Sequence, residues 1–184
     1  MDINTDAERI CTRSEFSNFL FHIERWPGNV PSCLLAIAKS IRAFASIDPT
    51  ISAKQVPWSV FARIIAKTLT EYTDMAVTDK CPLPLPLPNE EWNKVVAAQL
   101  CVTSPETCAY AIELLASSYS TDWANQTLSE FTSVLAGSVM WVGDIAAVYI
   151  GGEMEVIDGP LIRDPEMPPW MILSQILATG VDYE

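Results

Sequence analysis

The sequence predicts a mainly α-helical protein in which two pseudo-repeated helical units pack into one bundle-like body. It is also compatible with a small β-hairpin near 146–157. Three observations predict this fold. Apolar residues recur at helical spacing over most of the chain, the same landmarks occur in the same order in both halves, and a proline-rich run separates the halves. We therefore divide the chain into a first helical unit at 1–80, a linker at 81–91 and a second helical unit at 92–184.

The first shared landmark is a capped helix start. Thr12 is followed by Glu15, and Thr103 is followed at the same spacing by Glu106. A threonine cap with a glutamate three residues later is the pattern of a capping box. We expect helices to begin at these threonines, each with two large apolar residues at matching positions, namely Phe19 with Ile23 and Tyr110 with Leu114.

The second landmark is a Trp–Asn step followed by an apolar helix. The step occupies 26–29 in the first half and 123–125 in the second. The asparagine amide can satisfy backbone groups of such a turn. Residues 34–47 and 127–142 then place apolar side chains on one helical face.

The third landmark is a helix that begins with proline and tryptophan. Pro57-Trp58 and Pro169-Trp170 are both followed by apolar residues at i+2, i+3, i+6 and i+7, where i is the tryptophan. Proline is well tolerated in the first turn of a helix, where its missing amide would be unpaired. We predict two equivalent amphipathic helices here.

A proline run and an insertion break the repeat. Prolines alternate with leucines over 82–88, which predicts an extended spacer, or alternatively a ligand for an aromatic-lined groove. The second copy is longer by an acidic insertion at 143–168, where glycines and prolines indicate loops around a hairpin with strands at 146–150 and 154–157.

The net charge lies entirely in the second half. Residues 1–88 hold nine acids and nine bases, whereas residues 89–184 hold fourteen acids and two bases, Lys94 and Arg163, so the net charge of -12 belongs to the latter. Such a surface repels phosphate backbones, so we expect no direct nucleic-acid binding, and it attracts basic proteins. The alternative is that the acids keep an apolar protein soluble.

Motifs for catalysis and cofactor binding are absent from the sequence. It contains no GxGxxG, P-loop, GxSxG or HExxH pattern. His22 is the single histidine and the five cysteines form no CxxC pair, so we expect no zinc site, no cofactor and reduced thiols in a cytoplasmic protein. The apolar stretch at 134–152 contains Asp144 and glycines, which favours buried core over a membrane span.

The second half resembles a family of small uncharacterised bacterial helical proteins. The pattern is acidic-Trp-x-Asn-x-Thr-Leu, then an apolar helix, then Pro-Trp and a Tyr-Glu ending, which this chain carries at 122–128, at Pro169-Trp170 and at Tyr183-Glu184. The resemblance covers roughly 103–184. The first half matches it more weakly, and the insertion at 143–168 departs from it. The resemblance implies the helical fold and suggests toxin-immunity proteins.

We therefore expect a non-catalytic immunity protein that neutralises a cognate, basic, nuclease-type bacterial toxin by direct contact. A helical adaptor or scaffold protein is the alternative, followed by a hydrolase that uses carboxylates and a divalent metal ion. The acidic insertion and an unrepeated tryptophan are the expected partner-binding residues: Trp141, Asp144, Glu153, Glu155, Asp158, Asp164 and Glu166.

Overall fold

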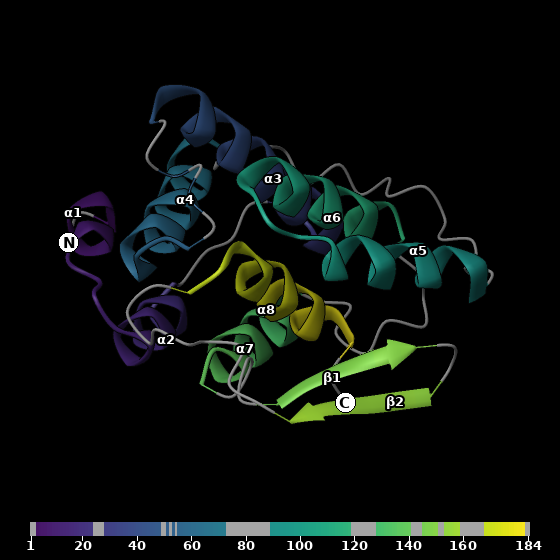
Figure 1. Cartoon of the computed structure of the whole chain (residues 1–184). Coiled ribbons are helices and arrows are strands. Elements are labelled where there is room, and N and C mark those ends of the chain that lie inside the picture. The colour runs from purple at the N-terminus through teal and green to yellow at the C-terminus, as the bar shows by residue number, and fades with distance from the viewer. Residues whose placement is uncertain are drawn as a thin grey trace.

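The computed structural model describes residues 3–23, 28–48, 51, 53, 55–72, 89–118, 128–140, 145–150, 153–158 and 168–182. These residues form a mainly helical body, as the sequence predicts (Figure 1). The helices are α1 (Ile3–Glu8), α2 (Arg13–Phe21), α3 (Val30–Ile47), α4 (Trp58–Glu71), α5 (Asn89–Leu100), α6 (Pro105–Ser117), α7 (Leu128–Ser138) and α8 (Trp170–Asp182). The strands are β1 (Ile145–Ile150) and β2 (Glu153–Asp158).

Capping boxes start α2 and α6, but the second lies one residue later than the sequence pattern suggests. Thr12 and Glu15 form the predicted box at α2. At α6 the cap is Ser104 with Thr107 as its partner, instead of Thr103 with Glu106. Pro105 explains the shift, because a proline favours the first helical position and holds the residue before it in the extended conformation. Ser104 has φ −148° and ψ 165°.

The corrected cap changes which residues of α2 and α6 are equivalent. Counting from Thr12 and Ser104, Phe16 matches Cys108 and Leu20 matches Ile112, and all four are buried. The pairing of Phe19 with Tyr110 is therefore wrong, and Tyr110 is 54% exposed. The repeat itself fits better after this correction, because the buried positions now coincide.

Helix α3 begins after the asparagine of the predicted Trp–Asn step. The side-chain oxygen of Asn29 accepts a hydrogen bond from the backbone amide of Ser32 at 3.0 Å, so Asn29 is the N-cap. Residues 24–27 and the second step at 123–125 lie outside the described residues. Both α3 and α7 bury one face, which carries Cys33, Ile37, Ala38, Ser40 and Ile41 on α3 and Phe131, Leu135, Ala136, Ser138 and Val139 on α7.

Helices α4 and α8 confirm the third landmark. Trp58 and Trp170 are fully buried, and the amides two residues after each tryptophan donate to the carbonyls of Pro57 and Pro169 at 2.9 and 3.0 Å. The predicted apolar positions are buried in both helices: Val60, Phe61, Ile64 and Ile65 in α4, and Ile172, Leu173, Ile176 and Leu177 in α8.

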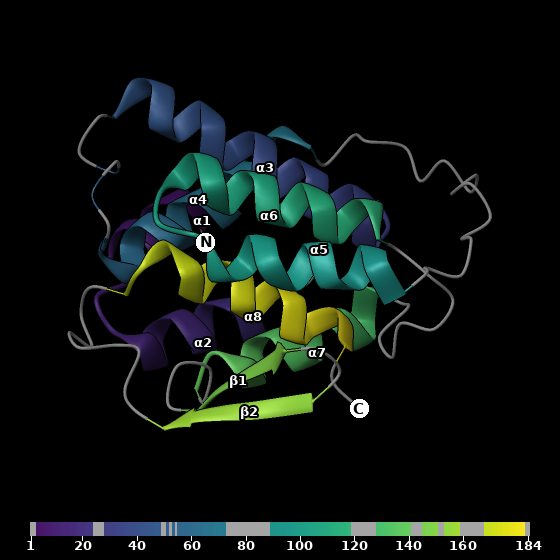
Figure 2. The ribbon, with the colours of Figure 1, turned by 45° about the vertical axis from the view of Figure 1, so that its right-hand side comes forward.

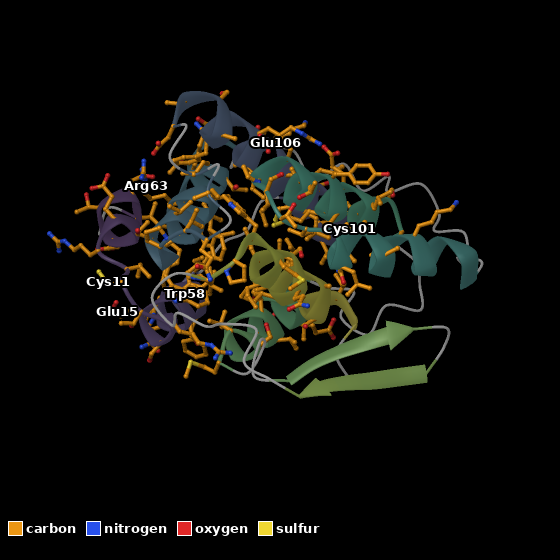
Figure 3. The ribbon with its side chains drawn as sticks, viewed as in Figure 1. Cys11, Glu15, Trp58, Arg63, Cys101 and Glu106 are labelled. Atoms are coloured by element: carbon orange, nitrogen blue, oxygen red, sulfur yellow. The ribbon has the colours of Figure 1, made fainter. Side chains whose placement is uncertain are left out.

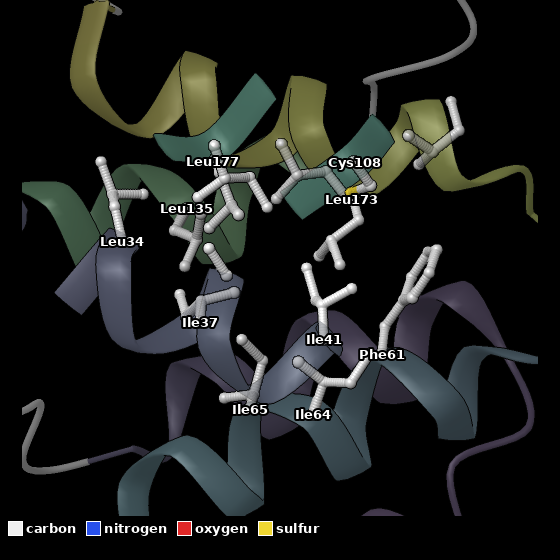
Figure 4. Packing of buried hydrophobic residues seen from close by; sticks show 14 of the residues in the cluster. Leu34, Ile37, Ile41, Phe61, Ile64, Ile65, Cys108, Leu135, Leu173 and Leu177 are labelled. Atoms are coloured by element: carbon white, nitrogen blue, oxygen red, sulfur yellow. The ribbon is translucent and has the colours of Figure 1, made fainter. Parts of the chain in front are cut away.

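The two units share one hydrophobic core. Buried residues of α3 and α4 pack with residues of α7 and α8 in a single cluster (Figure 4). Helix α2 packs on α7, and α6 packs along α3, so each unit lies against the other (Figure 2). A short antiparallel contact between Gln55 and Pro169 links the segments that precede α4 and α8.

The hairpin predicted near 146–157 is present as the antiparallel pair β1 and β2, with Ile145 opposite Asp158 and Ile150 opposite Glu153. It lies at the edge of the helical body (Figure 1). Residues 134–152 therefore do not form one helix, since α7 ends at Ser138 and β1 begins at Ile145. Among the described helices, Val30–Ile47 is long and apolar enough to cross a membrane, and half of it is buried inside the protein.

Candidate protein-binding site

The predicted binding residues fall on the hairpin and on segments around it. Glu153 and Glu155 occupy alternate positions of β2, opposite Ile150 and Val148. Alternate positions of a strand lie on the same face, so these two glutamates share one face of the ribbon and the position of Asp158 lies on the other. Four predicted residues lie outside the part of the chain that the structure describes: Trp141, Asp144, Asp164 and Glu166.

Helix α6 carries two acids, Glu106 and Glu113, and Glu113 forms an ion pair with an arginine of the first unit. Glu113 accepts a bidentate pair of hydrogen bonds from the guanidinium of Arg42 on α3, one of them at 2.9 Å. The hydrogen bond from Arg42 lowers the pKa of Glu113, and the same bond raises the pKa of Arg42. Glu106 lies in the first turn of α6 and is exposed (Figure 3). Arg42 thus compensates one negative charge of the acidic half.

The first unit contains a pocket that sequence reasoning missed. It encloses about 350 Å³ and is lined by Asn4, Glu8, Phe44, Arg63, Lys67, Thr70 and Glu71. The guanidinium carbon of Arg63 lies 5.1 Å from the centre of the Phe44 ring, and Lys67 forms an ion pair with Glu71. The helical spacing of Arg63, Lys67 and Glu71 was a signal for a charged face. The lining carries two cations and two carboxylates, so it suits a small polar ligand better than an anion.

The described nucleophilic and basic groups are not arranged together. The ring nitrogen Nδ1 of His22 lies 2.7 Å from the carbonyl of Asn18, at the exposed end of α2, and the imidazole packs edge-on against Phe21. Cys33 and Cys108 are buried, and burial raises the pKa of both thiols. Cys11 and Cys101 are exposed, and these four cysteines are all free. Within the described residues, no three His, Cys, Asp or Glu side chains gather where they could hold a metal ion.

Comparison of the chain with known protein families, curated proteins and solved structures finds no match. The resemblance of the second half to small bacterial helical proteins therefore stays a prediction. The features of this chain that bear on function are its charge distribution and the position of the hairpin.

Proposed function

We propose that this chain is a non-catalytic immunity protein that neutralises a basic, nuclease-type protein toxin by direct contact. The observation that carries the proposal is the hairpin at the edge of the body, whose second strand contains Glu153, Glu155 and Asp158. This strand belongs to the half of the chain that bears the whole net charge of -12. A toxin that acts on nucleic acid needs a basic surface to hold phosphate, and an acidic strand complements it.

Electrostatic complementarity acts mainly on association. Opposite potentials on two partners raise the association rate constant, and salt screens the effect. The energy that keeps a complex together comes mostly from buried aromatic and arginine side chains. We assign the first role to the acids of the insertion and the second to Trp141, which has no counterpart in the repeat.

The test starts from the protein encoded by the neighbouring gene. Its expression in a bacterial host should arrest growth, and co-expression of this chain should restore growth. The two purified proteins should also form a complex whose association slows as salt is added. A neighbouring product that is harmless and does not bind would contradict the proposal.

A charge-neutralised hairpin locates the contact. The triple variant Glu153→Gln/Glu155→Gln/Asp158→Asn should slow association about tenfold at low salt and less at high salt. The matched control is Glu90→Gln/Glu91→Gln/Glu106→Gln, which removes three charges from α5 and α6 of the same half. Equal slowing by both variants would show that overall charge acts, and not the hairpin.

Two further measurements distinguish an immunity protein from an adaptor and from a metal-dependent hydrolase. A helical adaptor would bind several partners and protect against none of them. A metal-dependent hydrolase would give saturable heat on titration with Mg²⁺ or Mn²⁺, because carboxylates are the ligands that these ions prefer. That heat would disappear in the hairpin variant and persist in the control.

A further inference from the structure

We propose that the two units hold each other through an isologous interface, of the kind that joins two copies in a homodimer, and that this interface keeps them together without the chain between them. The partner that each unit fits is the other unit, in the same chain or in a second copy. Isologous interfaces use the same patch on both partners, related by a two-fold axis. Two sets of contacts have this form.

The first set is the pairing of helices. Matching caps, burial and order make α2 equivalent to α6, α3 to α7 and α4 to α8. Within each unit the equivalent contacts recur, α3 with α4 and α7 with α8. Between units the contacts are reciprocal, because α2 of the first packs on α7 of the second while α6 of the second packs on α3 of the first.

The second set marks the axis. Pro57 and Pro169 are equivalent, so the residues before them, Val56 and Pro168, are equivalent too. Gln55 pairs with Pro169 in an antiparallel bridge, and the amide of Val56 donates to the carbonyl of Pro168 at 3.1 Å. Val56 therefore lies opposite its own counterpart. An antiparallel pair has this property at one place, where a two-fold axis passes between the strands.

Polar contacts add to both packing contacts between the units. In the α2–α7 contact, Arg13 donates to the carbonyl of Val139, and the hydroxyl of Ser17 donates to the carbonyl of Ala136 at 2.7 Å. In the equivalent α6–α3 contact, Arg42 and Glu113 form the bidentate ion pair. The polar residues differ in position and in chemistry between the two contacts, so they hold the units together without following the repeat.

The interface is also the core of the molecule. The ring of Phe61 lies 5.5 Å from that of Trp170, which is fully buried. The indole Nε1 of Trp170 donates to the carbonyls of Ile51 and Ala53, both at 3.1 Å. Separating the units would expose these apolar groups and leave the indole without those partners. Such an interface favours association strongly.

Cutting the folded chain tests the proposal. A specific protease site is inserted into the proline-rich segment at 81–88, and the purified full-length protein is cleaved after folding. The two fragments should elute together from size exclusion at the size of the uncut protein. The cut protein should also melt at a temperature that rises with protein concentration, because unfolding now releases two chains. The uncut protein should show no such dependence.

Exchange between copies tests the partner. Cut protein with a tag on the first unit is mixed with untagged cut protein, warmed and cooled, and the tagged unit should recover untagged second units. Arg42→Gln should speed this exchange, whereas Lys39→Gln, an exposed residue of the same helix, should not. Fragments that separate on cutting, or that never exchange after reversible melting, would overturn the proposal. A second variant with the site at 74–79 replaces the first if that insertion prevents folding.

Discussion

At the residue scale, Gly180 of α8 lets the helix backbone approach the ring of Phe131 on α7. Phe131 is fully buried, and the two residues lie where α7 packs against α8. A Cβ atom on Gly180 would lie 2.7 Å from Cε2 and 2.9 Å from Cδ2 of the Phe131 ring. The large ring on α7 is therefore accommodated by the missing side chain on α8.

We expect Gly180→Ala to lower the free energy of unfolding by about 1–3 kcal/mol, because the added methyl group overpacks the contact with Phe131. The matched control is Gly137→Ala on the exposed side of α7, where nothing lies within 4 Å of an added Cβ. That substitution should stabilise the protein by about 0.5–1 kcal/mol, since alanine is the better helix former. Urea unfolding measures both, and equal effects would contradict the packing argument.

The ion pair of Arg42 with Glu113 predicts a dependence of stability on pH. Its hydrogen bond lowers the pKa of Glu113 in the folded protein. A lowered pKa gives stability that is complete above the unfolded value, about 4.3, and that is lost as pH falls through the folded value. At pH 7, Glu113→Gln should lower the free energy of unfolding by about 0.5–1 kcal/mol.

Acid titration of the two proteins checks the sign of this prediction. The difference in unfolding free energy between wild type and Glu113→Gln should shrink as pH falls below about 4.3. In an Arg42→Gln background the difference should be small at every pH, because the partner that lowers the pKa is gone. A difference that grows in acid would contradict the assignment.

At the scale of single elements, the start of α2 depends on its capping box. The side chain of Thr12 accepts from the amide of Glu15 at 3.2 Å, and the carboxylate of Glu15 accepts from the amides of Cys11 and Thr12 at 2.8 and 2.9 Å. These backbone hydrogen bonds lower the pKa of Glu15. The box satisfies amides that the first helical turn leaves unpaired.

Thr12→Ala should therefore destabilise the protein by about 1 kcal/mol, and Thr12→Ser should restore most of that loss. Thermal unfolding followed by circular dichroism measures the change. If alanine and serine behave alike, the hydroxyl does not act as the cap. The substitutions Ser104→Ala and Ser104→Thr test the N-cap of α6 in the same way.

At the scale of the whole molecule, reciprocal packing should make unfolding cooperative. Helices α3 and α7 belong to different units but line one core. We expect a single transition in urea, and we expect the slowest-exchanging amides of α3 and α7 to report the same opening free energy. Trp170→Phe, which removes the indole donor from two carbonyls, should lower both opening free energies together. Two separate transitions would contradict the shared core.

The sequence by itself determined the features that depend on neighbours along the chain. Apolar residues at helical spacing predicted the buried faces of α4 and α8. The Asn29 cap depends on an amide three residues later. The glycines and prolines of the insertion predicted the hairpin. These signals are local, because caps, turns and amphipathic faces form from residues a few positions apart. The cap at Thr103 was the exception, since the influence of Pro105 on Ser104 outweighed the spacing of Glu106.

Only the tertiary structure decided how the units face each other and what lies between them. Two helical units with similar apolar faces can pack in many ways, and the pairing of α2 with α7 and of α6 with α3 depends on the fit of side chains far apart in sequence. The pocket beside Phe44 likewise requires α1, α3 and α4 to meet. Shape complementarity between distant surfaces leaves no periodic signal in the chain, so it becomes visible when the helices are placed together.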